Sequence, residues 1–277
     1  MLIVIRVFYI VAFVLYALAA GAYLRDFRSS GTGGDVRRTR LWTIRLGVLL
    51  HFVGLAACAF YLRQAPFMGI LQGFGFASWI LAMMFLHISH SFEDETSVGM
   101  VIMPLAALFA IPGLFATLAK VTDPLLSSNP WFILHACIAL YGYGAFTIAF
   151  TGAALYLILH REIKSKRLGT VFQRLPSLDQ LDYMTYMSVT LGFVALTVSI
   201  ITGMVWTMLR LGKLLQFDIK EVITFANWLI YAFYLHSRYS GRWRGRCAAW
   251  LVILGFAVVL FNFLVVTVLL SSTHAYI

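Results

Sequence analysis

Charged residues are scarce in this sequence: only 12% of the 277 residues are Asp, Glu, Lys or Arg, whereas 61% are apolar. A soluble domain of this length could not bury so much apolar surface, so the composition excludes a soluble globular protein. Cysteine is scarce too, and Cys58, Cys137 and Cys247 lie in different apolar segments without a C-x-x-C pair. The sequence therefore excludes a disulfide framework and a thiol relay, and it indicates a membrane protein.

Long apolar runs are what the sequence does contain. A spanning helix needs about 17–25 apolar residues to cross about 30 Å of hydrocarbon, and eight segments meet or approach this length. The predicted helices are residues 2–24, 46–62, 67–90, 97–119, 131–159, 183–209, 223–237 and 247–271. We expect an all-α, polytopic membrane helix bundle with about eight transmembrane helices, formed as a single integral membrane domain over residues 1–277.

Acidic residues are outnumbered by basic ones, 11 against 21, and the basic residues are unevenly distributed. Three predicted connections, 25–45, 161–174 and 238–246, hold six, five and four of them. Because Lys and Arg accumulate in cytoplasmic loops, this asymmetry places both termini outside. The net charge of +10 follows from this topology. The sequence thus predicts a multi-pass protein of the plasma or inner membrane, in contact with the lipid bilayer and with no nucleic acid.

Two predicted helix starts carry capping signals. Asn129 followed by Pro130 is typical of an N-cap and a first helical residue. Ser177 and Gln180 have the spacing of a capping box. The helix that follows Asn129 also carries a stripe of small residues, Ala145, Ala149, Gly152 and Ala153. Such a stripe lets another backbone approach closely, so we expect this helix to be central to the bundle.

Histidines are the candidate functional residues, because no activated nucleophile, paired carboxylates or hydrolase-type metal cluster is recognisable and no catalytic residue is predicted. His135 lies about one and a half turns into the fifth predicted helix, and His274 follows the eighth. Both positions are on the outer side and at matching heights. Two neutral imidazoles that face each other across a gap commonly hold haem iron. A frayed polar tail is the alternative interpretation of His274.

A second pair of histidines is suggested by depth. His51 is six residues from Arg45, and His87 is six residues from Glu93 in the next, antiparallel helix. At about 1.5 Å per residue, each histidine is roughly 9 Å from the cytoplasmic boundary. An ionisable residue at that depth is a candidate functional site, and a ring that is hydrogen-bonded to a neighbouring helix is the alternative.

Several stretches carry a resemblance to a known family. They are "WFILHACIALYGYGAFTIAFTGAALYLI" from 131, "LPSLDQLDYMTY" from 175, "GFVALTVSIITGMVW" from 192, "WLIYAFYLHSRYSGRWRGRCAAWLVILGF" from 228 and the closing "HAYI". From about residue 130 the chain resembles the CcsA/HemX group of cytochrome c assembly membrane proteins, which handle haem. The first half matches more weakly, at "LLHFVGL" and "APFMGILQGFGFASW". The resemblance implies that His135 and His274 are axial ligands of an external haem b and that His51 serves an inner haem site, whereas His87 has no family counterpart.

One segment departs from the family pattern. Synthases of the family carry an outer motif similar to W-G-x-x-W-x-W-D-x-K-E-x-W, where residues 211–223 read "LGKLLQFDIKEVI". Phe217 and Asp218 are the candidate cofactor contacts in this segment, and residues 210–222 are predicted to form an external amphipathic segment. Because leucine cannot stack on a porphyrin as tryptophan does, we expect a weaker or altered haem platform. A lipid-facing loop with solvated charges at Asp218 and Glu221 is the alternative.

Three functions remain open at this point. The first is a haem-handling component of c-type cytochrome biogenesis that presents haem outside between two histidines, as part of a cytochrome c haem-lyase complex. Its partners would be a second assembly subunit with a large outer domain and an apocytochrome c. The second is a HemX-like accessory or regulatory membrane protein that does not ligate haem. The third is a b-type electron-transfer cytochrome.

Overall fold

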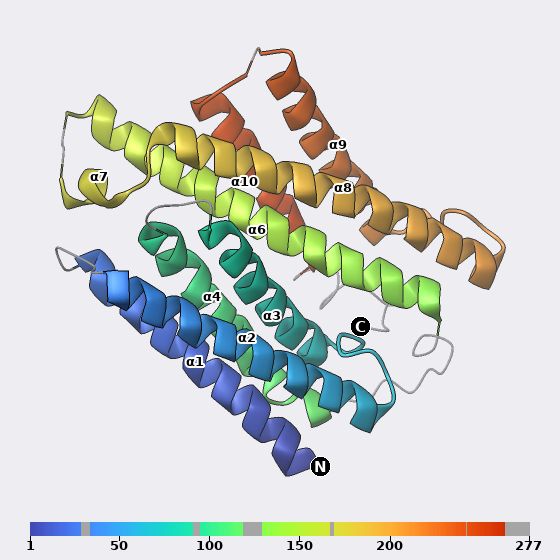
Figure 1. Cartoon of the computed structure of the whole chain (residues 1–277). Helices are drawn as coiled ribbons and strands as arrows, with labels where there is room; N and C mark the ends of the chain where they lie inside the picture. The colour runs from blue at the N-terminus through green and yellow to red at the C-terminus, as the bar shows by residue number, and fades with distance from the viewer. Residues whose placement is uncertain (29–33, 91–94, 119–128, 167–168, 242, 264–277) are drawn as a thin grey trace. The chain divides into compact units, whose positions relative to one another are not determined.

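The computed structural model describes the chain except for residues 29–33, 91–94, 119–128, 167–168, 242 and 264–277 (Figure 1). The described residues form helices and connections and contain no strand. Within the described residues, seven helices are long and apolar enough to cross a membrane, which confirms the predicted polytopic helical membrane bundle. The helix at 219–239 is 21 residues long but is not one of these seven. The predicted orientation of the termini stays a prediction.

Most helices begin and end near their predicted limits. They are α1 (Leu2–Arg28), α2 (Gly34–Leu62), α3 (Ile70–Ser89), α4 (Thr96–Gly113), η1 (Ala116–Leu118), α6 (Pro130–Lys164), α7 (Thr170–Arg174), α8 (Leu178–Leu211), α9 (Ile219–Tyr239) and α10 (Arg246–Leu260). The largest difference is α2, which begins well before the predicted start at residue 46. The predicted connection 25–45 is helical over most of the part that the structure describes, since α1 extends to Arg28 and α2 begins at Gly34. Arg37 and Arg40 in this part pair with the buried carboxylates of Glu95 and Asp26.

The chain divides into two compact units, Met1–Ser128 and Asn129–Ala275, and each is described by itself. In unit 1, α1 packs against α2 and α4, and α3 packs against α4. Figure 1 shows α1 and α2 lying along each other. Tyr9, Tyr16 and Tyr23 recur every seventh residue of α1 and are all buried. This spacing keeps the three rings on one face of the helix, which is the face that packs inside unit 1.

The end of unit 1 that carries the arginines holds a buried ion cluster. Arg40 pairs with Asp26 at 3.0 Å and with Glu95 at 3.5 Å, and Glu95 also accepts from Arg37 at 2.7 Å. The Tyr23 hydroxyl donates to Glu95 at 3.2 Å, and the Arg40 guanidinium lies 4.5 Å from the Tyr23 ring centroid. The cluster ties α1 and α2 to the start of α4. Each charge is thereby compensated where water cannot solvate it.

Unit 2 is built on two long helices, α6 with 35 residues and α8 with 34. At about 1.5 Å per residue each is roughly 50 Å long, so both extend beyond a hydrocarbon layer of about 30 Å. Both predicted caps are confirmed. The Asn129 side chain accepts from the backbone N–H groups of Trp131 and Phe132, and Ser177 forms a reciprocal capping box with Gln180.

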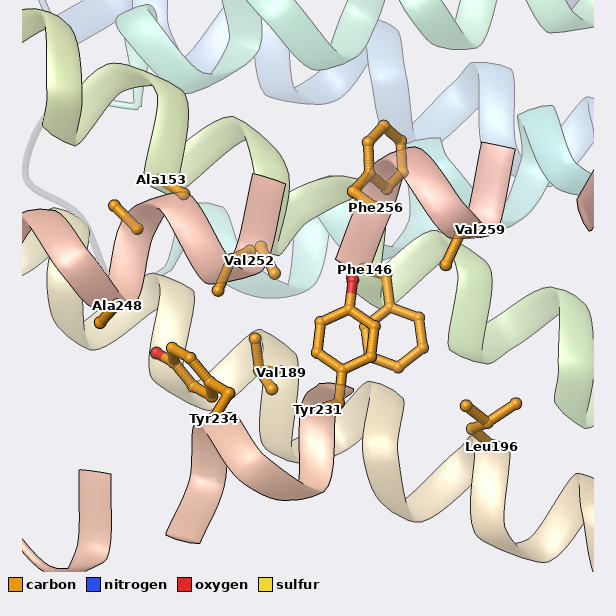
Figure 2. Close-up of a cluster of buried hydrophobic side chains, with 12 residues drawn as sticks. Phe146, Ala153, Val189, Leu196, Tyr231, Tyr234, Ala248, Val252, Phe256 and Val259 are labelled. Carbon is orange, nitrogen blue, oxygen red and sulfur yellow. The ribbon is translucent and has the colours of Figure 1, made fainter. Parts of the chain in front are cut away.

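The core of unit 2 lies where α6, α8, α9 and α10 meet (Figure 2). Ala145, Ala149 and Ala153 of the small-residue stripe are fully buried, which agrees with the predicted central position of this helix. The close approach brings the Phe146 ring of α6 against Tyr231 of α9, with centroids 3.9 Å apart and the planes parallel within 1°. Figure 2 shows these two rings stacked.

Gly192 of α8 leaves the space that Phe146 occupies. A Cβ at this position would lie 2.6 Å from the Phe146 ring, so we expect Gly192→Ala to lower the free energy of unfolding by about 1–3 kcal/mol. Gly21→Ala in α1 is the matched control, because its Cβ would meet nothing within 4 Å. Thermal unfolding of the detergent-purified variants measures the difference. Equal midpoints for the two variants would contradict this packing.

Candidate functional site

His135 is held against α8 near the start of α6. Its Nδ1 lies 2.7 Å from the carbonyl oxygen of Ser199 and 3.1 Å from the Ser199 hydroxyl. The same hydroxyl donates to the carbonyl of His135 at 3.3 Å. One turn along α8, a Cβ at Gly203 would lie 2.8 Å from Nδ1. The imidazole is half-buried, and its orientation is therefore set by Ser199 together with the space that glycine leaves at position 203.

The contact with the Ser199 carbonyl determines the tautomer of His135. A carbonyl oxygen can only accept, so Nδ1 carries the proton in this contact, and in the neutral ring the lone pair is then on Nε2. Metal-ligating histidines usually donate their second ring N–H to a carbonyl or carboxylate in this way. His135 can thus bind a metal through Nε2 only, with its ring orientation fixed beforehand.

Aromatic side chains lie next to His135 on both helices. Phe132 is one turn earlier on α6, and its ring centroid is 5.0 Å from that of Trp206 on α8. Both rings are almost fully buried. The Arg210 guanidinium lies 5.4 Å from the Trp206 ring centroid. This end of the α6–α8 pair therefore combines an oriented imidazole, an apolar aromatic pair and a cation.

His274, the predicted partner of His135, lies outside the described residues. The external pair of ligands therefore stays a prediction. Of this predicted pair the structure describes His135 alone, with its ring oriented by Ser199 so that Nε2 can bind a metal.

His51 occupies a different environment inside unit 1. Its side chain is 0% exposed, and neither ring nitrogen has a hydrogen-bond partner in the described part of the chain. The ring lies against Tyr9, with centroids 5.2 Å apart, and against Tyr16, with centroids 5.8 Å apart. Gly47 and Gly54 flank it on α2, where a Cβ would lie 2.8 Å from the Tyr16 ring and 3.1 Å from the Phe8 side chain. The two glycines let α1 approach His51 closely.

His87 does not share the environment of His51. It is exposed in the last turn of α3, whereas His51 is buried among tyrosines of α1. The structure does not bring the two rings together, and the predicted pair stays a prediction without support from geometry.

The predicted external segment 210–222 is mostly a connection between two helices. α8 ends at Leu211 with Gly212 in the left-handed conformation at φ 67°, and α9 begins at Ile219. Phe217 is 76% exposed and also has a positive φ of 55°. Placed in this way, its ring projects from the connection.

Asp218 and Glu221 are capping residues of this connection. The Asp218 side chain accepts from the Glu221 backbone N–H at 2.8 Å. The Glu221 carboxylate accepts from the backbone N–H groups of Gln216 and Phe217 at 2.9 and 2.8 Å. These bonds fix the path of the chain into α9. A haem contact of Phe217 or Asp218 remains a proposal.

Replacing Asp218 by alanine removes the N-cap of α9. We expect a loss of about 1 kcal/mol in the free energy of unfolding, whereas Asp218→Asn should lose little because asparagine caps equally well. Urea unfolding of the two detergent-purified variants measures this difference. If asparagine were as damaging as alanine, the charge of Asp218 would matter beyond capping.

Four residues that shape these histidine environments were missed from the sequence: Ser199, Gly203, Tyr9 and Tyr16. The signals that point to them are weak. Ser199 and Gly203 are a small-residue pair one turn apart, and such pairs are common in membrane helices. The tyrosines have the seven-residue spacing of one helix face, which by itself indicates only packing. Their relation to the histidines requires the pairing of helices to be known.

The fold and these side chains define a class: a multi-pass helical membrane protein with an oriented, ligand-competent histidine near a helix end. The family model for "Cytochrome C assembly protein" matches residues 67–274. Protein HemX of Brevibacillus brevis is 30% identical over 275 residues, which cover 94% of this chain and 95% of that protein. The chain belongs to the cytochrome c assembly protein family, and this membership supports a role in c-type cytochrome biogenesis.

Other relatives agree with this assignment. The cytochrome c biogenesis protein CcsA of Parasynechococcus marenigrum (strain WH8102) is 27% identical over 238 residues, which cover 76% of this chain and 77% of CcsA. Among solved structures, the cytochrome c heme lyase CcmF has the same fold, with a TM-score of 0.69 and 17% identity. The match covers 95% of this chain and 46% of CcmF, so the chain spans about half the length of that protein.

Proposed function

We propose that this protein handles haem during c-type cytochrome biogenesis, holding it at the outer face of the membrane between His135 and His274. The observation that carries the proposal is the bond of His135 Nδ1 to the Ser199 carbonyl at 2.7 Å. It leaves the Nε2 lone pair as the coordinating group of an oriented imidazole. Phe132 and Trp206, which pack against each other, make this end of the α6–α8 pair apolar, as the surroundings of a porphyrin must be.

Haem b is the substrate or cargo in this proposal, and the residues present fit it. Haem iron accepts an imidazole nitrogen on its axis, and apolar surroundings bury the ring. Attachment of haem to a c-type cytochrome needs haem vinyl groups and cysteine thiols, which the substrates bring. The part left to this chain is to bind haem, orient it and shield it from water. It needs no catalytic residue of its own.

An inner haem site at His51 is the second part of the proposal. An unpaired buried polar atom costs about 1–3 kcal/mol, and both ring nitrogens of His51 are of this kind in the described part of the chain. A metal bound to one nitrogen would offset part of this cost. The burial of His51 between α1 and α2 would also shield such a ligand from water.

His51→Gly should lower the haem content of the purified protein, and added imidazole should restore it, because free imidazole can occupy the space of the missing side chain. His87→Ala is the matched control, and we expect no loss because His87 is exposed. The pyridine haemochrome assay measures haem per protein. Equal losses in both variants would support the predicted His51–His87 pair instead, and no loss in either would reject the inner site.

The proposal also includes partners. A second assembly subunit with a large outer domain and an apocytochrome c would complete a haem-lyase complex in the plasma or inner membrane. Cells that lack this protein should then lose covalently bound haem in their c-type cytochromes, and the wild-type gene should restore it. Haem staining of denatured membranes measures this loss. Unchanged staining in the deletion strain would contradict the proposal.

An accessory role without haem is the second candidate. It is favoured by the connection 213–218, where the aromatic platform expected of a synthase is reduced to the exposed ring of Phe217. A b-type electron-transfer cytochrome is the third. Purification separates them: a b-type cytochrome keeps haem at stoichiometric occupancy, a haem-handling protein holds it labilely, and an accessory protein has no Soret band.

A further inference from the structure

A groove of about 410 Å³ runs between α1 and α2 in unit 1, at the end that carries the arginines. Leu18, Ala19 and Ala22 of α1 line its apolar part. Arg25 of α1 and Arg40 and Asp35 of α2 line its polar part. Along α1, Leu18 and Arg25 are seven residues apart, which is roughly 10 Å at 1.5 Å per residue. The lining of the groove thus changes from apolar to charged along this length of α1. The change matches the order of acyl chain and headgroup in a membrane lipid.

Arg25 is the cation of this groove that is most open to its surroundings. Arg25 and Arg40 both pair with Asp26, and Arg40 and Arg37 both pair with Glu95. Three arginines therefore share two carboxylates. Asp35 on the opposite wall lies in the first turn of α2. The positive end of the helix dipole there partly compensates its negative charge. The Arg25 side chain is 71% exposed, so its guanidinium can contact a bound headgroup.

We propose that this groove binds an acidic phospholipid. The phosphate lies at Arg25, whose exposed guanidinium attracts it, and an acyl chain lies over Ala19 and Ala22. Small side chains there provide the space that a chain needs. The positive-inside rule places this end of unit 1 in the cytoplasmic leaflet, where acidic lipids attract basic residues. The site is independent of haem handling and lies outside the surroundings of His135 and His51.

Binding of defined lipids to the delipidated full chain in detergent tests this site. Native mass spectrometry is used to titrate phosphatidylglycerol and phosphatidylcholine with identical acyl chains. We expect tighter binding of phosphatidylglycerol, and Arg25→Gln should weaken that binding about fivefold while leaving phosphatidylcholine unchanged. Arg38→Gln is the matched control, because Arg38 is exposed on α2 and does not line the groove. It should change binding less than twofold.

Three outcomes would overturn the proposal. Equal affinity for the two lipids would remove the role of headgroup charge. Equal losses in Arg25→Gln and Arg38→Gln would show that overall surface charge, and not the groove, attracts the lipid. Displacement of phosphatidylglycerol by inorganic phosphate at millimolar concentration would show a site for a free anion. Ala22→Trp supplies an independent check, because filling the apolar part should weaken the binding of both lipids.

Discussion

Replacing Arg40 with alanine is expected to lower the free energy of unfolding by about 3–5 kcal/mol, because it removes the one buried cation that pairs with both Asp26 and Glu95. The Arg40 side chain is 3% exposed, and those of Asp26 and Glu95 are 5% and 0% exposed. Without Arg40, Asp26 keeps only the exposed Arg25, and Glu95 keeps Arg37 and the Tyr23 hydroxyl, so the two buried carboxylates are only partly compensated. Unfolding of the purified protein by SDS in mixed micelles measures the loss.

Arg25→Ala is the matched control for this prediction. Arg25 also contacts Asp26, at 3.1 Å, but it is largely exposed, and such pairs contribute about 0–1 kcal/mol. The double variant Arg40→Ala with Glu95→Gln should lose less than the sum of the single losses, because the neutral amide no longer needs a cation. Similar losses in Arg40→Ala and Arg25→Ala would contradict the role of burial in this cluster.

Replacing His135 with alanine is expected to weaken haem binding by roughly a hundredfold or more. Mutating a residue that only orients a metal ligand already lowers metal affinity by about 10–100-fold, and losing the ligand itself should cost more. Titration of the lipid-reconstituted protein with haem, followed at the Soret band, measures the affinity. His160→Ala is the matched control, because His160 lies in the same helix and stacks on Tyr156. It should leave the affinity unchanged.

Gly203→Ala separates ligation by His135 from packing around it. The added Cβ would lie 2.8 Å from His135 Nδ1 and push the ring from its bond to Ser199. We expect an intermediate loss of haem affinity, about 10–100-fold, with the histidine still present. If Gly203→Ala bound haem as well as the wild type while His135→Ala did not, the result would support His135 as a ligand. It would contradict the proposal that the bond to Ser199 orients His135 for haem binding.

The helices of this fold could be predicted because their signals are local. Apolar length identified the spans, and Asn129 and Ser177 identified two helix starts, which the structure confirms. The start of α2 could not be found in this way. Its arginines are typical of a solvated basic loop, and only the distant Glu95 and Asp26, with which Arg37 and Arg40 pair, explain why Arg40 is buried in a helix.

The candidate site could be predicted only in part, for a similar reason. Depth along a helix singled out His135 and His51, because the distance of a residue from the predicted end of a helix can be found by counting residues. What each ring contacts depends on which helix packs against it. Ser199 supplies the carbonyl for His135, and Tyr9 and Tyr16 surround His51, across helix pairs that composition does not specify. Depth also made His87 look equivalent to His51, although only His51 faces the interior.

The most direct test of haem handling at His135 and His274 is the electron paramagnetic resonance spectrum of the purified protein after addition of one equivalent of ferric haem. We expect the low-spin signal of iron with two axial imidazoles, converted to a high-spin signal by His274→Ala. A high-spin signal in the wild type, or a low-spin signal that His274→Ala leaves unchanged, would contradict the proposed pair of ligands.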